Sequence, residues 1–184
     1  EARLCIIGRI GWKCEALVQR IRHHREFGHR LFMFNEIDDS GLEYAYEHAS
    51  ALVFSSHAEG FGLPLVEAMQ RGLPAMGSDL PVFREIGGDC MAYFDLDHPQ
   101  TLTELIQRFE ASGTFPAASS LDAWHWIDWH ASALQLVDGV VRPHAPSGQR
   151  NSSGPPVSQG FPASSRKSAV IYPELGGFGI TPDR

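Results

Sequence analysis

The stretch 55–69 constrains the fold more than any other part of the chain; it reads Ser-Ser-His-Ala-Glu-Gly-Phe-Gly-Leu-Pro-Leu-Val-Glu-Ala-Met. The residues just before it, 51–54, form an apolar run that is typical of a buried strand. Gly60 and Gly62 allow the backbone to turn tightly, and Pro64 suits the first position of a helix, where its missing N–H costs nothing. The stretch therefore predicts a strand, a glycine loop and a helix in direct succession.

The start of this predicted helix is a candidate anion site. Unpaired N–H groups and the positive end of the helix dipole meet at Gly62 and Leu63. Two carboxylates flank the loop, Glu59 before it and Glu67 in the expected first helical turn. Carboxylates accept hydrogen bonds from hydroxyl groups, so they suit a phosphate that carries sugars better than a bare phosphate. We therefore predict a sugar-nucleotide site.

Short apolar runs alternate with helical patterns over the rest of residues 1–141. The predicted strands are 4–7, 31–34, 51–54, 73–77 and 91–94, and the predicted helices are 15–24, 42–49, 65–70 and 100–111, with one helical turn at 82–86. This alternation is typical of right-handed βαβ crossovers. The predicted fold class is α/β, a Rossmann-like parallel sheet with flanking helices. Pro74 is expected to place the strand 73–77 at an edge of the sheet.

The C-terminal part of the chain changes in character. Trp124, Trp126 and Trp129 precede a predicted helix over 130–141 and are expected to dock it onto the domain. Residues 142–184 are rich in Pro, Gly and Ser and show no sustained period, which is typical of a disordered tail or linker. Within them, 168–172 has the composition of a strand, one that would belong to a unit further along the chain.

Composition narrows the class of function. The chain has 184 residues, of which 43% are hydrophobic and 20% charged, as in globular proteins. Its net charge of -7 argues against nucleic-acid binding, which requires a basic patch. No apolar run is long enough to span a bilayer. The three widely spaced cysteines fit neither a disulfide framework nor a zinc motif. Reduced thiols and a cytoplasmic location are expected.

The motif 59–69 resembles the donor-binding motif of retaining glycosyltransferases of the GT-B fold, the group 1 (family 4) type. In that motif a Glu precedes a Gly-Phe-Gly-Leu-Pro run, and a second Glu follows eight positions after the first. The resemblance covers residues 3–141 and continues through 8–12, 78–86 and 126–133. It implies that residues 1–141 are an N-terminally truncated nucleotide-sugar-binding domain, the C-terminal half of a GT-B fold. The details are most similar to bacterial mannosyl- or rhamnosyltransferases that build O-antigen and other surface polysaccharides.

The resemblance also implies roles for single residues. Glu59 is the implied catalytic residue and would bind hydroxyls of the transferred sugar, and Glu67 would hold the ribose hydroxyls. Ile37 would contact the base through its main chain, although Asn35 stands where a Gly is common. The full set of implied donor-binding residues is Glu59, Gly60, Phe61, Gly62, Leu63, Glu67 and Ile37. No metal and no cofactor are implied, because such enzymes stabilise the leaving diphosphate with helix dipoles and basic side chains.

The implied partners are a UDP- or GDP-sugar, a saccharide or lipid-linked acceptor, and an N-terminal Rossmann-like domain. That domain, and a first strand and helix carrying an Arg and a Lys, would precede Leu4. We therefore expect a fragment of a longer hexosyltransferase, inactive alone, working in the cytoplasm or at the inner face of the plasma membrane. The alternative is a non-catalytic nucleotide-sugar-binding or interaction domain. The spacing of Glu59 and Glu67 disfavours an epimerase or a phosphorylase.

Other polar clusters have simpler interpretations. His23, His24 and His29 lack carboxylate or cysteine partners at ligand spacing, so a solvated helix face is expected there rather than a metal site. Gly8 and Gly11 lack the third glycine of a dinucleotide fingerprint. The position of Arg84, after the fourth strand, leaves three partners open: a phosphate, Glu85 and Asp79.

Overall fold

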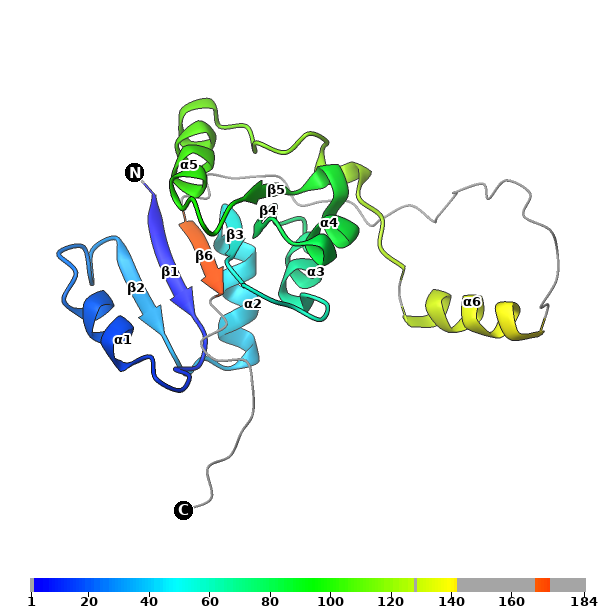
Figure 1. The fold of residues 1–184 in the computed structure, drawn as a ribbon, viewed down its shortest axis with the longest axis horizontal. Coiled ribbons are helices and arrows are strands. Elements are labelled where there is room, and N and C mark those ends of the chain that lie inside the picture. Colours follow the sequence, from blue (N-terminus) through cyan, green and yellow to red (C-terminus); the bar gives the residue numbers. More distant parts are fainter. Residues whose placement is uncertain (1, 128, 142–167, 173–184) are drawn as a thin grey trace, which may run out of the picture.

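The fold is an α/β fold with a twisted parallel sheet, seen in a computed structural model that describes residues 2–127, 129–141 and 168–172 (Figure 1). Its strands are β1 (Arg3–Ile7), β2 (Leu31–Phe34), β3 (Ala51–Phe54), β4 (Ala75–Ser78), β5 (Ala92–Phe94) and β6 (Ser168–Tyr172). The helices are α1 (Glu15–Arg22), α2 (Asp39–His48), α3 (Leu63–Gln70), α4 (Pro81–Gly87), α5 (Gln100–Ser112) and α6 (Trp129–Val141), with short 3-10 turns η1 (Gly88–Cys90) and η2 (Leu121–Ala123). Within the described residues the strand order is β2-β1-β6-β3-β4-β5, and every pairing is parallel. The predicted fold class is confirmed.

The core has two parts, one on each face of the sheet. Successive side chains of a strand point to opposite faces, so Leu52 and Phe54 of β3 pack with buried residues of α2, α3 and α4, such as Tyr46 and Leu65. Val53 faces the other way and packs with β4 and β5 against apolar side chains of α5. β3 is thus covered on both faces, which explains its unbroken apolar sequence.

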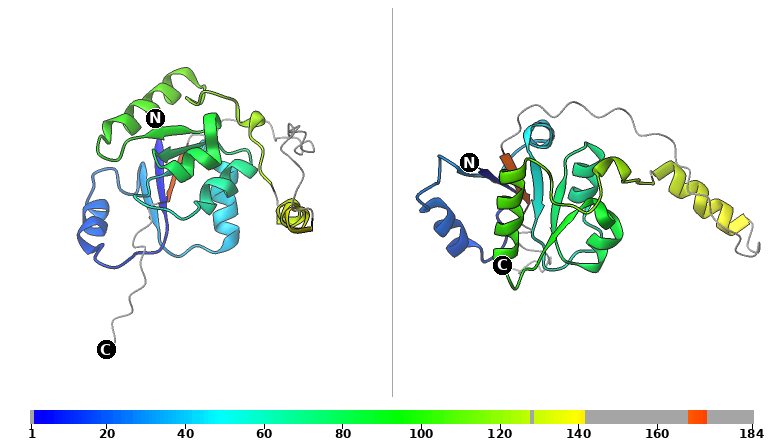
Figure 2. Two further views of the ribbon diagram at one scale, coloured as in Figure 1. Left: turned by 45° about the vertical axis from the view of Figure 1, so that its right-hand side comes forward. Right: turned by 90° about the horizontal axis from the view of Figure 1, so that it is seen from above.

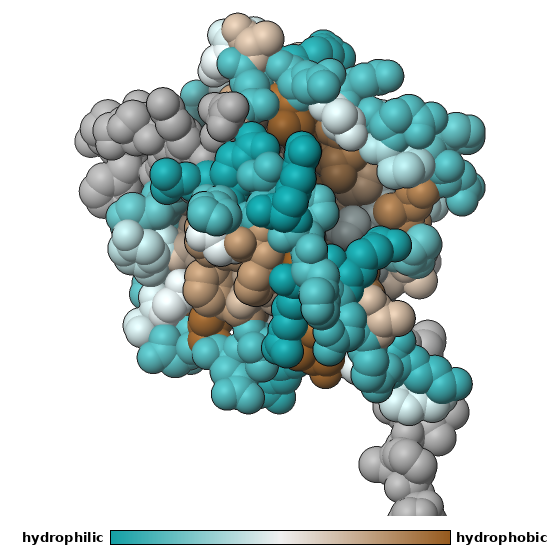
Figure 3. Space-filling view, turned by 90° about the vertical axis from the view of Figure 1, so that its left-hand side faces the viewer, coloured by the Kyte–Doolittle hydropathy of each residue, from teal (hydrophilic) through white to brown (hydrophobic). Residues whose placement is uncertain are grey.

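The sheet is less covered at the end where β2 lies. Strand β2 has no fully buried residue, and Phe34 at its end is 45% exposed. Viewed from that end, the surface is mostly hydrophilic, with apolar side chains visible between the polar ones (Figure 3). The best-buried part of the molecule therefore surrounds β3 and β4, where the motif 55–69 begins.

Strand β6 stands in the middle of the sheet, between β1 and β3 (Figure 1). Val170 is the register partner of Cys5 on one side and of Leu52 on the other. Formation of a strand at 168–172 agrees with the sequence, but its place does not, because we expected it in a later unit. The sequence pattern could not reveal this, since a strand's partners are set by long-range pairing. The other residues of the predicted tail, 142–167 and 173–184, lie outside the described residues.

Strand β4 is an interior strand, flanked by β3 and β5, and the prediction of an edge strand was wrong. Pro74 precedes the strand, so its missing N–H removes nothing from the ladder. Its carbonyl still accepts a hydrogen bond from the N–H of Leu52 at 2.9 Å. A proline is compatible with an interior strand when it stands at the strand's start.

Trp124 fixes the segment before α6 rather than α6 itself. Trp124 packs against the larger core cluster and donates from Nε1 to the carbonyl of Ile86 at 2.8 Å. Helix α6 extends away from the sheet in all three ribbon views (Figures 1 and 2). Its apolar side chains are exposed; Leu136, for example, is 70% exposed. The expected docking of this helix onto the domain is therefore not observed.

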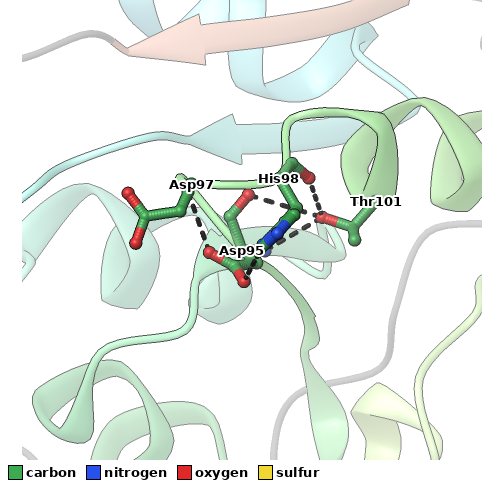
Figure 4. A network of polar contacts seen from close by, with 4 residues as sticks. All are labelled: Asp95, Asp97, His98 and Thr101. Atoms are coloured by element: carbon green, nitrogen blue, oxygen red, sulfur yellow. Dashed lines mark hydrogen bonds and ion pairs between the residues drawn. The ribbon is translucent and has the colours of Figure 1, made fainter.

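Helix α5 begins with a compact polar network (Figure 4). Asp95 accepts from the N–H of Asp97 at 2.8 Å, and its other oxygen lies 2.8 Å from Nδ1 of His98. Thr101 accepts from the N–H of Asp95 at 3.0 Å and donates to the carbonyl of His98 at 2.7 Å. These bonds tie the end of β5 to the first turn of α5, which covers one face of the sheet.

Candidate functional site

The glycine loop is anchored at its start by two serines. Ser78, at the end of β4, is buried and donates to the carbonyl of Ser56 at 2.6 Å. Ser56, also buried, donates to the carbonyl of Ala58 at 2.9 Å. Buried hydroxyls that satisfy loop carbonyls hold irregular backbone in place. The chain therefore leaves β3 along a defined path towards Glu59.

Gly62 is the position in the loop that only glycine fits. It is the N-cap of α3 and has φ 85°, in the left-handed region. A Cβ atom built there would stand 2.8 Å from Cε1 of Phe83, a fully buried residue of α4. Both backbone conformation and close packing thus require glycine. The sequence pattern marked Gly62 but could not name Phe83, which lies on another helix.

The outer surface of the loop is accessible. Gly60 is exposed, Leu63 is 55% exposed, and Glu59 is half-buried. The N–H of Leu65 bonds to the carbonyl of Gly62 at 3.0 Å, which closes the first turn of α3. The N–H groups that open a helix have no intrahelical partner, so they and the dipole favour an anion here. The structure thus shows a helix start at Leu63, and the binding of an anion there stays a prediction.

Phe61 lies at the surface with its ring against a tryptophan. The ring is 43% exposed and meets Trp126 edge-on, with ring centroids 5.4 Å apart. Trp126 in turn stacks on Trp124 at 6.0 Å. The side chain of Phe61 therefore fastens the loop to the segment before α6. A role in the site would fall to its main chain.

Glu67 is the fifth residue of α3, not a residue of the first turn as the sequence suggested, because the helix begins at Leu63. An effect on the helix dipole, which is confined to the first turn, is therefore a poor explanation for this carboxylate. Its Oε2 atom accepts a hydrogen bond from the hydroxyl of Tyr46 on α2 at 3.0 Å. Sequence reasoning missed this partner, although Leu42, Tyr46 and Ala49 share one face of the predicted helix 42–49.

A surface pocket of about 230 Å³ lies between α2 and α3 beside this contact. Its lining residues are Asp39, Leu42, Glu43, Tyr46, Glu67 and Arg71. The lining combines hydrogen-bond acceptors with one cation and an aromatic ring. Such a pocket can hold a polyhydroxyl group, whose O–H groups donate to carboxylates.

The loop after β2 leaves the sheet at the same end as the glycine loop after β3, the carboxyl end of the parallel strands. Because all the strands are parallel, the segments after β2 and β3 leave the sheet at one edge, beside the point where the strand order reverses. Ile37 is half-buried against the larger core cluster. Asp38 caps α2 by accepting from the N–H of Gly41 at 2.8 Å, which lowers the pKa of Asp38. Asp39 then reaches the pocket that Glu67 lines.

Arg84 is paired with Asp79. Its Nη2 atom lies 2.8 Å from Oδ2 of Asp79, and Nε bonds the other carboxylate oxygen. The guanidinium also lies over the ring of Tyr93, 4.4 Å from its centroid. The bond to Arg84 lowers the pKa of Asp79, whereas burial raises the pKa of Tyr93 to about 12. Of the partners that the sequence left open for Arg84, the structure selects Asp79 over Glu85.

The described residues contain neither a metal-binding cluster nor a membrane-spanning helix. No three His, Cys, Asp or Glu side chains gather there as a metal site would require. No helix in residues 2–127 and 129–141 is long and apolar enough to cross a bilayer.

Comparison with known proteins places these features in a family. A family model described as "Glycosyl transferases group 1" matches residues 1–119. The serotype-specific mannosyltransferase WbdA of Escherichia coli is 35% identical over 140 residues, which are 76% of this chain and 17% of that protein. The O-antigen chain mannosyltransferase RfbU of Salmonella typhimurium is 33% identical over 85 residues, 46% of this chain and 24% of that protein. The chain thus spans only a small part of the length of these relatives.

Proposed function

Because the chain belongs to the family of group 1 glycosyl transferases, we propose that it is the donor-binding half of a hexosyltransferase. The enzyme would transfer a hexose from a UDP- or GDP-sugar to a saccharide or lipid-linked acceptor, with retention at the anomeric carbon, in cell-surface polysaccharide synthesis. The names of the relatives, mannosyltransferases of O-antigen type, favour mannose as the hexose. One observation carries the proposal: the Gly62 cap opens α3 between two carboxylates, Glu59 and Glu67.

Each part of the donor has a partner in this arrangement. The diphosphate lies at the start of α3, against the main-chain N–H groups of Phe61, Gly62 and Leu63. Glu67 accepts hydrogen bonds from the ribose hydroxyls, and Glu59 accepts them from the transferred sugar. The base lies against the main chain of Ile37, in the loop after β2. This assignment uses the parallel sheet, because these segments emerge at the same edge.

The chemistry is the departure of a diphosphate. Negative charge grows on the leaving oxygen as the glycosidic bond breaks, and the opening N–H groups and dipole of α3 stabilise that charge without a metal ion. Glu59 orients the sugar so that the acceptor attacks from the face of the leaving group. The acceptor would be held by a second, N-terminal Rossmann-like domain of a longer enzyme.

Calorimetric titration of the 184-residue chain with GDP and with UDP tests the donor site. We expect one of them to bind, and Glu67→Ala to weaken that binding about tenfold or more, because the ribose hydroxyls lose a charged acceptor. Glu47→Ala, at an exposed position on α2 outside the pocket, is the matched control and should leave the dissociation constant unchanged. The proposal is contradicted if neither nucleotide binds, or if Glu67→Ala binds the nucleotide as tightly as the wild type does.

A further inference from the structure

The hydroxyl of Tyr46 is held at the carboxylate that lines the pocket. Tyr46 is 1% exposed, and its O–H donates to Oε2 of Glu67 at 3.0 Å, joining α2 to α3 across 21 positions of sequence. A buried tyrosine hydroxyl needs a partner. Here the partner is a charged oxygen rather than a main-chain carbonyl, and hydrogen bonds to charged groups are the stronger kind.

We propose that Tyr46 is a positioning residue for Glu67: it holds one carboxylate oxygen so that the remaining acceptor sites face the pocket and the ribose hydroxyls. This inference rests on the proposed function. A free glutamate side chain loses rotamer entropy when a ligand immobilises it. Because Oε2 is already bonded to Tyr46, much of that entropy is lost when the protein folds. Less is then lost when the ligand binds, so the affinity for the ligand is higher.

A second contact, between Arg71 and the ring of Tyr46, supports the same arrangement. Arg71 lies over the ring of Tyr46, with Cζ 5.1 Å from the centroid. Its Nη1 atom donates to the main-chain carbonyl of Glu67 at 3.0 Å, so this cation is directed at the backbone and not at the carboxylate. The remaining lone pairs of the carboxylate thus stay available to hydroxyl donors.

A purely structural role and a positioning role differ in what they do to ligand binding. If Tyr46 only stabilises the packing of α2 on α3, its hydroxyl affects all nucleotides alike. If it positions Glu67, its hydroxyl matters only for ligands that bear ribose hydroxyls. The quantity to measure is therefore the ratio between the affinity for a nucleotide with ribose hydroxyls and the affinity for one without them. A general loss of affinity would leave that ratio unchanged.

The experiment titrates the full chain with GDP or UDP, whichever binds more tightly, and with its 2′,3′-dideoxy counterpart. In Tyr46→Phe we expect a loss of affinity of about tenfold for the ribonucleotide and little change for the dideoxynucleotide. Tyr44→Phe is the matched control: it makes the same chemical change on α2, but Tyr44 is 63% exposed and does not line the pocket. Its ratio should equal that of the wild type.

A double-mutant cycle isolates the route of the effect. Added to Glu67→Ala, which already lacks the carboxylate, Tyr46→Phe should cause no further loss of ribose discrimination. A Tyr46→Phe variant that keeps the wild-type ratio overturns the inference, and so does an additive effect in the cycle.

Should Tyr46→Phe fail to fold, a chain with 4-fluorophenylalanine in place of Tyr46 fills the same space without a donor and gives the same test. A wild-type chain that does not distinguish the two nucleotides refutes the proposed ribose site instead.

Discussion

At the scale of single residues, the two glycines of the motif have different tasks. Gly62 has a left-handed backbone conformation and packs closely against Phe83. Each of these two features by itself requires a residue without a side chain. Gly60 has no atom within 4 Å of an added Cβ, and its φ is not positive. Its small size leaves the outer face of the loop open. One glycine therefore shapes the site, and the other keeps it accessible.

Gly62→Ala should destabilise the protein and impair nucleotide binding. The left-handed conformation costs an alanine about 1 kcal/mol or more, and the clash with Phe83 adds a similar amount. We expect a total loss of about 2 kcal/mol in the free energy of unfolding, measured by urea denaturation. Gly60→Ala is the control and should change it by less than about 0.5 kcal/mol. Equal stability of the two variants would show that Gly62 is not constrained as described.

At the scale of elements, the polar network of Asp95, Asp97, His98 and Thr101 stabilises the start of α5 (Figure 4). The bond to His98, together with the N–H of Asp97, lowers the pKa of Asp95. A carboxyl whose pKa is lower in the folded state stabilises that state above its ordinary pKa. This contribution disappears as the pH falls through the lowered value. The network is exposed, so its effect is small.

Asp95→Asn should therefore lower the melting temperature slightly at pH 7, by no more than about 2 °C. The difference from the wild type should shrink as the pH falls below about 4, because the wild-type carboxyl becomes protonated first in the unfolded state and then, at a lower pH, in the folded state. Thermal melts followed by circular dichroism between pH 7 and about 3 measure this. Asp97→Asn is the control, since Asp97 joins the network through its main-chain N–H. A difference that is constant with pH would contradict the assignment.

At the scale of the whole molecule, β6 joins the two parts of the sheet that the described residues form. Strands β1 and β2 lie on one side of β6, and β3, β4 and β5 lie on the other. Both neighbours are parallel to β6, and each is paired to it over four residues. The switch point of the topology, beside which the candidate donor site lies, is thus built around a strand supplied from the far end of the chain.

Val170→Pro should disrupt the whole fold. A proline in an interior strand removes a ladder N–H and leaves a buried carbonyl without its partner, so we expect a loss of about 2 kcal/mol or more. Ala133→Pro makes a comparable change in α6, which stands apart from the sheet, and should leave the main thermal transition in place (Figures 1 and 2). A Val170→Pro chain that melts like the wild type would show that β6 does not hold the two parts together.

Much of the site followed from local pattern. The glycines, Pro64 and the apolar run 51–54 predicted the strand, loop and helix, because turn chemistry and side-chain period act over a few residues. The family resemblance assigned Glu59, Glu67 and Ile37 to the donor, and those roles stay predictions. The sequence pattern took Pro64 as the first helical residue and so placed Glu67 in the first turn. The helix in fact begins one residue earlier, at Leu63.

The sequence by itself determined the parallel α/β class and the cap at Gly62, since alternating strand and helix patterns allow few other arrangements. Only the tertiary structure decided what touches these elements: Tyr46 on Glu67, Phe83 under Gly62, Asp79 on Arg84, and β6 between β1 and β3. Contacts of this kind join segments far apart in the chain. They depend on which surfaces meet when the sheet assembles, and no local period records that.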